Sequence, residues 1–86
     1  MREFVHVNWS HEPDGNVAHM AEHGVTPGEF EQVLTRYFED RERSRSSDCW
    51  VVEGLTDAGR YLVIVFEWEE DIDLINPVTA YEPDKE

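Results

Sequence analysis

His23-Gly24-Val25-Thr26-Pro27-Gly28-Glu29-Phe30 is the stretch that decides the fold, because it can end one helix and begin another within a single turn. Glycine readily adopts the left-handed conformation that closes helices, so Gly24 predicts a helix end. Val25 is then placed to contact Met20 across that closure. The stretch therefore predicts a helix that stops at Gly24.

The same stretch carries the signals of a helix start. Thr26 is suited to the capping position and Pro27 to the first helical position. Glu29 can complete a capping box with Thr26, and Val25 can pack on Phe30 as a hydrophobic staple. Two consecutive helices joined by a very short turn are the expected result.

Apolar spacing on each side of this junction supports both helices. Upstream, Val17, Met20 and Ala21 share one side of the first helix, with Asp14 or Ser10 as candidate caps. Downstream, apolar residues recur at intervals of three and four, which predicts a stripe that packs on a sheet. They are Phe30, Val33, Leu34, Tyr37 and Phe38.

Four segments have strand patterns: residues 4–9, 49–53, 61–68 and 72–81. Segment 61–68 is apolar on both faces, which predicts a central position in the sheet. Pro77 cannot donate a ladder hydrogen bond, so the last strand should be an edge strand or carry a bulge there. Residues 39–48 lose apolar periodicity, which predicts a polar loop.

The order strand, helix, helix and three strands joined by short turns predicts an α+β fold, β-α-α-β-β-β. We expect an antiparallel meander with two helices packed on one face. A chain of 86 residues supports one core, so residues 1–86 should form a single domain. The residues expected to be buried include Phe30, Val33, Leu34, Tyr37, Val63 and Val65.

Composition narrows the classes of function. Twenty Asp and Glu residues against seven Lys and Arg residues give a net charge of −13, which opposes nucleic-acid binding. The longest apolar run, residues 61–66, is too short to span a membrane. Cys49 is the single cysteine, so no internal disulfide can form and a cytoplasmic location is expected.

Several short motifs together resemble the BrnT family of toxins, which belongs to the RelE-like ribonuclease superfamily. The resemblance covers most of the chain, and it implies a RelE-like fold, RNA cleavage and a small DNA-binding antitoxin as partner. The motifs that carry it are Asn16, His19, Glu22-His23-Gly24-Val25-Thr26-Pro27, Gly59-Arg60, Leu62 to Phe66 and Val78-Thr79-Ala80.

Two departures from the family pattern affect the expected activity. Tyr81 stands where typical members have Arg after the last strand, and Glu82-Pro83-Asp84-Lys85-Glu86 stands in place of a basic helix. Cleavage of RNA without a metal needs positive groups that stabilise the transition state. We therefore expect weak or no ribonuclease activity and a role as a protein-interaction module. An active toxin is the alternative.

The candidate catalytic residues are Arg60 for charge stabilisation, with His23 or Tyr81 for proton transfer. Arg43 and Arg45 are the candidate RNA contacts, because guanidinium groups bind phosphate with paired hydrogen bonds. They belong to an arginine-rich segment, 36–45, in which interleaved acidic residues also favour local salt bridges.

Metal binding is not expected. His19-Met20-Ala21-Glu22-His23 matches the written form of an inverted zinc-protease signature, but the distant third ligand of such enzymes is missing. We therefore predict no metal and no cofactor. The acidic residues of the last hairpin are either a solvated tip or a docking surface for a basic partner. They are Glu67, Glu69, Glu70, Asp71 and Asp73.

Overall fold

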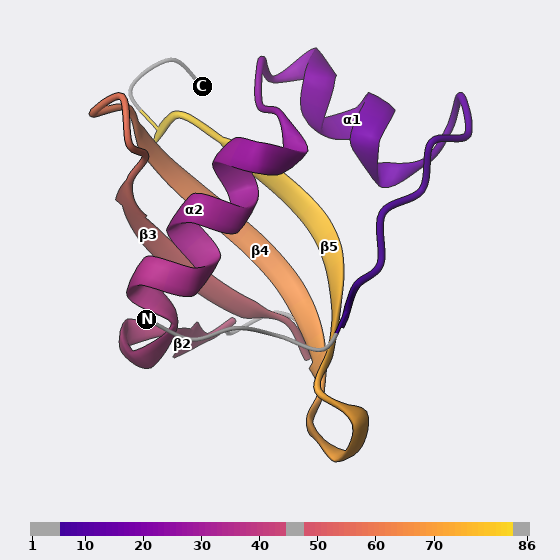
Figure 1. The fold of residues 1–86 in the computed structure, drawn as a ribbon, viewed down its shortest axis with the longest axis vertical. Coiled ribbons are helices and arrows are strands. Elements are labelled where there is room, and N and C mark those ends of the chain that lie inside the picture. Colours follow the sequence, from indigo (N-terminus) through magenta and orange to yellow (C-terminus); the bar gives the residue numbers. More distant parts are fainter. Residues whose placement is uncertain (1–5, 45–47, 84–86) are drawn as a thin grey trace.

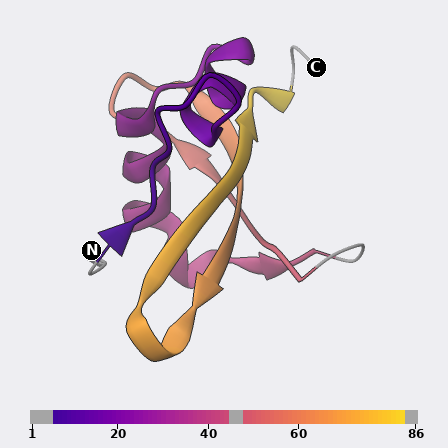
Figure 2. The same cartoon turned by 90° about the vertical axis from the view of Figure 1, so that its right-hand side faces the viewer.

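The computed structural model describes residues 6–44 and 48–83, in which two helices lie against one face of a five-stranded mixed sheet (Figures 1 and 2). The helices are α1 (Asn16–Glu22) and α2 (Pro27–Tyr37), with short 3-10 turns η1 (Phe38–Asp40) and η2 (Glu70–Ile72). The strands are β1 (His6–Val7), β2 (Glu42–Arg43), β3 (Trp50–Leu55), β4 (Tyr61–Glu69) and β5 (Leu74–Tyr81).

The strand order is β1-β5-β4-β3-β2. Neighbouring strands from β2 to β5 run antiparallel, whereas β1 runs parallel to β5. The α+β class, the two helices and the central place of β4 are confirmed. Among residues 6–44 and 48–83, neither helix has the length and apolarity that crossing a membrane requires.

Two features of the sheet differ from the sequence prediction. A strand was predicted at residues 4–9, but its parallel pairing with β5 was not, and this pairing becomes possible because the two helices carry the chain back across the sheet. Residues 42–43 form strand β2 where a loop was predicted. Both residues are exposed at the sheet edge, and backbone pairing there needs no apolar pattern.

The junction between the helices has the predicted conformation. Gly24 has a φ of 74°, the Val25 N–H donates to the Met20 carbonyl at 3.0 Å, and the Gly24 N–H donates to the Ala21 carbonyl at 2.9 Å. This is the Schellman closure of a helix. Met20 and Val25 are both buried in the core cluster.

The start of α2 is also confirmed. The Glu29 N–H donates to Thr26 Oγ1 at 3.2 Å, and the Thr26 N–H donates to Glu29 Oε1 at 3.0 Å, which completes the capping box. Pro27 occupies the first turn, where its missing N–H costs nothing.

The predicted caps of α1 are wrong. Its N-cap is Gly15, which makes no side-chain hydrogen bond, rather than Ser10 or Asp14. Asn16 holds the helix start instead. Its Oδ1 accepts from the Ser10 N–H at 2.9 Å, and its Nδ2 donates to the carbonyls of Asn8 and Pro77. These contacts reach into β5, which a local capping rule cannot anticipate.

Helix α2 lies across β3 and β4 (Figure 1), and its predicted stripe is buried at Phe30, Val33 and Leu34. Tyr37, which was expected to be buried, is only half-buried, and its ring lies against Gly54 of β3. A Cβ at Gly54 would stand 2.2 Å from that ring, so this close approach requires glycine.

The two faces of β4 differ in what covers them. Leu62, Ile64 and Phe66 point toward the helices and are fully buried. Val63 is buried as predicted, but Val65 is half-buried. Both valines lie on the face opposite the two helices.

Pro77 lies at an irregularity in the ladder. Val65 pairs with Thr79 and Phe66 pairs with Pro77, so Val78 is the extra residue of a bulge. The bulge is one of the two outcomes predicted at Pro77. It also changes which residues at the end of β5 face the helices. The bulge shifts the alternation of side chains, so that Ala80 again faces the helices.

Candidate functional site

Arg60 is fixed at the start of β4 by the turn that precedes it. Its backbone N–H donates to Thr56 Oγ1 at 3.1 Å, and its carbonyl accepts from the Thr56 N–H at 2.8 Å. Gly59, with a φ of 82°, allows this tight return of the chain. Thr56 is buried, so this turn packs against the rest of the protein.

The guanidinium of Arg60 reaches three parts of the chain. Nη1 donates to the Gly24 carbonyl at 2.7 Å and to the two carboxylate oxygens of Glu29 at 2.9 and 3.0 Å. Nε donates to Glu82 Oε1. We call Arg60, Glu29, Glu82 and the Gly24 carbonyl the Arg60 cluster. Its two carboxylates exceed its one cation, so its formal charge is negative.

Burial and pairing within the Arg60 cluster shift two pKa values. Hydrogen bonding to Glu29 raises the pKa of Arg60 against a smaller opposing effect of burial, and Glu82 adds to the increase. For Glu29, burial acts to raise the pKa, but hydrogen bonds from Thr26 and Arg60 together outweigh it and lower the pKa. Both groups are therefore charged near neutral pH.

His23 lies at the same corner of the molecule, as the C-cap of α1 and the neighbour of Gly24. Its ring meets the ring of His19 edge to face, with centroids 5.4 Å apart. His19 Nδ1 is 3.9 Å from a carboxylate oxygen of Glu22. Over the described part of the chain, no three His, Cys, Asp or Glu residues are grouped so that they could hold a metal ion.

Tyr81 is next to Glu82 in sequence but faces the other way. Glu82 bonds to Arg60 on the helix-covered side of the sheet, and side chains alternate along an extended chain. Tyr81 therefore projects from the opposite face, where its strand partner is Val63. The structure brings Arg60 and His23 to one corner and leaves Tyr81 across the sheet.

Arg43 lies far from the Arg60 cluster. It pairs with Trp50 at the first end of β3, whereas the turn that carries Arg60 follows the last residue of β3. At a rise of 3.3 Å per residue this places them about 17 Å apart along the strand. Arg43 lies 3.8 Å from Asp48 and 4.8 Å above the Trp50 ring. Arg45 lies outside the described residues.

The other arginines of segment 36–45 are held differently. Arg36 donates to the Leu55 carbonyl at 3.2 Å and forms an ion pair with Asp57, from outside the segment. Arg41 lies against aromatic rings instead of a carboxylate, and its buried Nε has no hydrogen-bond partner. Its guanidinium carbon is 4.3 to 5.0 Å from the ring centroids of Phe38, Trp50 and Trp68.

Sequence reasoning missed the partners of Arg60. Glu29 was interpreted only as a helix cap, and Glu82 only as part of an acidic tail. The capping box was a usable signal for Glu29, because it fixes the side chain beside the Gly24 turn. No local pattern pointed to Glu82, since its contact with Arg60 joins residues 22 positions apart.

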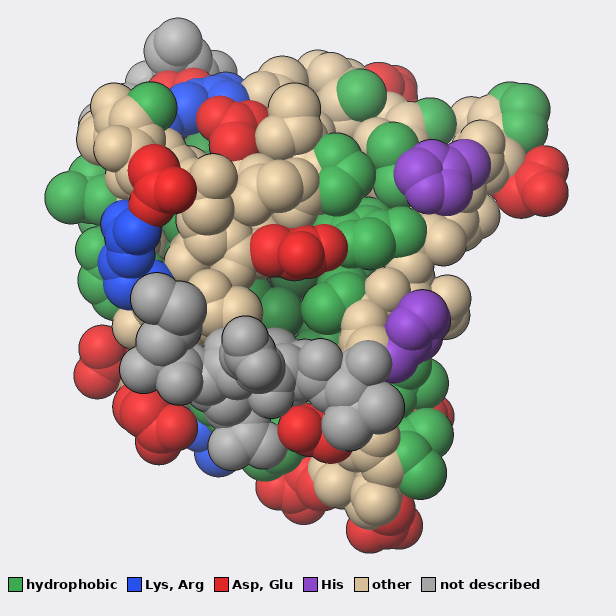
Figure 3. Space-filling view, in the orientation of Figure 1, with side chains coloured by type: hydrophobic (Ala, Val, Ile, Leu, Met, Phe, Trp, Pro, Cys, Tyr) green, Lys and Arg blue, Asp and Glu red, His purple; other side chains and the backbone are tan. Residues whose placement is uncertain are grey.

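The helix-covered side of the molecule is predominantly acidic. In Figure 3, red acidic side chains are spread over this side, whereas blue basic side chains stay near its left margin. This distribution agrees with the net charge of −13.

Comparison of the chain with protein-family models, with curated proteins and with solved structures gives no match.

Proposed function

We propose that this protein is a BrnT-like protein-interaction module with weak or no ribonuclease activity and a small antitoxin-like protein as its partner. The observation that carries the proposal is the Arg60 cluster. Arg60 is the candidate cation for the transition state, and its Nε and Nη1 are already bonded to Glu82 and Glu29.

The charge of the cluster argues against phosphate chemistry. A phosphorane-like transition state gains negative charge, and a positioned cation lowers its energy. Here a phosphate bound to Arg60 would lie beside both carboxylates, which already accept hydrogen bonds from its Nε and Nη1. Tyr81, which stands where the family has Arg, is a neutral group on the opposite face. Counted over the described residues, the proposed catalytic corner therefore carries a net negative formal charge.

One observation favours the alternative, an active ribonuclease toxin. His23 and Arg60 lie at the same corner, and the Gly24 carbonyl next to His23 accepts from Arg60. A general acid or base beside a cation is the minimum that metal-free cleavage needs. In that case RNA would bind Arg60 beside the two carboxylates that already pair with it.

The test is expression of the chain in a bacterial host with total RNA followed over time. Continued growth with intact RNA is the expected result. Arg60→Gln and His23→Gln serve as site variants, and Arg36→Gln is a matched control at a surface ion pair outside the cluster. Circular dichroism confirms that each variant is folded.

Rapid growth arrest with RNA cleavage would overturn the proposal, provided that folded Arg60→Gln and His23→Gln proteins lose the activity and Arg36→Gln keeps it. The loss from removing one essential cation should then reach about 3 to 4 kcal/mol of transition-state stabilisation.

A further inference from the structure

The face of the sheet opposite the helices can be assigned from strand register. Val65 pairs with Val51 on one side and with Thr79 on the other, Glu53 pairs with Val63, and Leu55 pairs with Tyr61. Directly paired residues point to the same side, and alternate residues along a strand share a face. The residues between them in the same strands are buried under the helices: Val52, Leu62 and Ile64. The residues of the pairs named above therefore lie on the face opposite the helices. We call it the bare face.

The bare face has an apolar centre that the described helices leave uncovered. Both helices pack on the other side of the sheet (Figure 2). Leu55 and Tyr61 are each 43% exposed, and Val51 and Val65 are half-buried. A row of apolar side chains on an exposed sheet face is typical of a docking surface.

The charges on the bare face have one sign. Glu42 pairs with Val51, and Glu67 and Glu69 continue the same alternation along β4, so all three join Glu53 on this face. Among the described strand residues, the bare face carries no Lys or Arg. An apolar strip bordered by carboxylates is complementary to a segment that is apolar and basic.

A hollow of about 400 Å³ lies at the acidic end of the strip. Glu67, Glu69 and Asn76 line it from the bare face, and Arg43, Trp50 and Trp68, which register places on the helix side, complete its wall with Asp48. Arg43 is the single cation in this lining and is 3.8 Å from Asp48. A basic side chain entering the hollow from the bare face would meet the carboxylates of Glu67 and Glu69.

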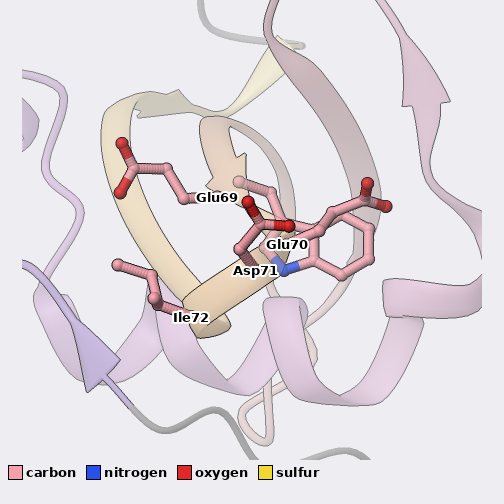
Figure 4. Close-up of a pocket in the computed structure, with 5 residues that line it drawn as sticks. Glu69, Glu70, Asp71 and Ile72 are labelled. Carbon is pink, nitrogen blue, oxygen red and sulfur yellow. The ribbon is translucent and has the colours of Figure 1, made fainter.

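The turn beyond the hollow extends this acidic end. Figure 4 shows Glu69, Glu70 and Asp71 projecting from the turn between β4 and β5, with Ile72 beside them. A second hollow, of about 450 Å³, is lined by these residues and Trp68. The acidic end therefore continues from the bare face onto the hairpin tip.

We infer that the bare face binds a basic amphipathic segment of a partner protein, with its apolar side on Val51, Val65 and Tyr61 and a Lys or Arg in the hollow. The inference rests on the proposed interaction function and names its surface and the chemistry of its partner. A second copy of this chain is unsuited, because a symmetric contact would place carboxylates against carboxylates. Nucleic acid is repelled by the same charges.

The experiment uses the full chain and a short amphipathic peptide of Leu and Lys. A peptide of Leu and Glu with the same spacing is the control. Binding is measured by calorimetry, and the contact is located from methyl NMR shifts. We expect binding of the Lys peptide alone, with shifts at Val51, Leu55 and Val65 and none at the helix-face residues Val33 and Leu34.

Matched charge reversals test the location. Glu42→Lys with Glu67→Lys changes the bare face, and Glu12→Lys with Glu39→Lys makes the same change in net charge at exposed residues outside it. The bare-face pair should lower peptide affinity about tenfold, and the control pair only about twofold. Raising salt from about 50 to about 300 mM should weaken binding.

Four results would overturn the inference: no binding of the Lys peptide, methyl shifts on the helix side, equal losses from the two reversals, or self-association abolished by the bare-face reversal. Binding of single-stranded RNA at the same methyl groups would also overturn it. These outcomes are separate from RNA cleavage in cells, so failure of the docking surface is distinguishable from failure of the proposed function.

Discussion

Arg60 connects three parts of the chain that are distant in sequence. It reaches the end of α1 through the Gly24 carbonyl, the start of α2 through Glu29, and the end of β5 through Glu82. The side chains of the three charged residues are less than one third exposed. Arg36 makes a comparable pair with Asp57, but both of those side chains are more exposed.

Replacing Arg60 should therefore cost more stability than replacing Arg36. Arg60→Met leaves two partly buried carboxylates without their cation, and we expect a loss of about 2 kcal/mol. The corresponding fall in melting temperature is about 8 to 16 °C for a domain of this size. Arg36→Met removes a surface pair and should cost less than about 1 kcal/mol. Thermal and urea unfolding check both values, and equal losses would contradict the structural role of Arg60.

The lowered pKa of Glu29 predicts a pH dependence of stability. Its pKa in the folded chain lies below the ordinary value of 4.5, so folding favours the ionised form. This contribution is fully present above 4.5 and is lost as the pH falls through the folded pKa. The stability difference between the wild type and Glu29→Gln should therefore shrink below 4.5.

Glutamine keeps a side-chain carbonyl for the capping box, so Glu29→Gln mainly removes the charge. The free energy of unfolding of both proteins is measured by urea denaturation at pH values from about 7 to about 3. A difference that stays constant or grows in acid would contradict the assignment.

At the level of secondary structure, the short connection between α1 and α2 orients both helices. Its geometry depends on the left-handed Gly24, with a φ of 74°, and on the capping box of Thr26 and Glu29. A Cβ at Gly24 would meet nothing closer than Arg60 Nη2 at 3.4 Å, so there is space for a methyl group. The requirement for glycine there comes from the backbone conformation.

Two Gly→Ala substitutions in this connection should have opposite effects. Gly24→Ala forces a residue with a Cβ into the left-handed region and should cost about 1 to 2 kcal/mol. Gly28→Ala lies in the first turn of α2, outside that region, where the nearest atom is 3.9 Å from the added carbon. It should stabilise the chain by about 0.5 to 1 kcal/mol. Urea unfolding of both variants gives the sign of the change in the free energy of unfolding. A Gly24→Ala protein as stable as the wild type would refute the argument.

The strands show where local patterns stop being informative. Segment 61–68 was placed at the centre of the sheet because both of its faces are apolar, and β4 is central. Segment 4–9 was predicted as a strand from its alternation, but alternation does not reveal that β1 pairs in parallel with β5. Strand β2 has only two residues, too few for an alternation to be detected. The pairing of β1 and β2 follows from the positions of β5 and β3, which only the folded chain brings beside them.

For the molecule as a whole, the excess of carboxylates should oppose folding. A net charge of −13 on a chain with a radius of gyration of 12.0 Å concentrates like charges in a small volume. Salt screens this repulsion, since the Debye length falls to about 8 Å at physiological ionic strength.

We therefore expect the melting temperature to rise as sodium chloride increases from about 10 to about 500 mM. Scanning calorimetry measures the melting temperature, and a neutral solute at the same osmolarity is the control. A melting temperature that falls with salt would show that attractive pairs such as those of Arg60 outweigh the overall repulsion.

The sequence by itself determined the features that depend on neighbours along the chain. The closure at Gly24, the cap at Thr26 and the stripe of α2 all follow from local conformational limits and periodicity. The α+β class follows from the order of these elements.

Only the tertiary structure decided the contacts between distant residues. Arg60 could be chosen as a candidate from its sequence, but the carboxylates that neutralise it could not. Likewise, four glutamates collect on one sheet face only after the register of β2, β3 and β4 is set. The physical reason is that pairing across a sheet depends on backbone register, and a shift of one residue moves every side chain to the other face.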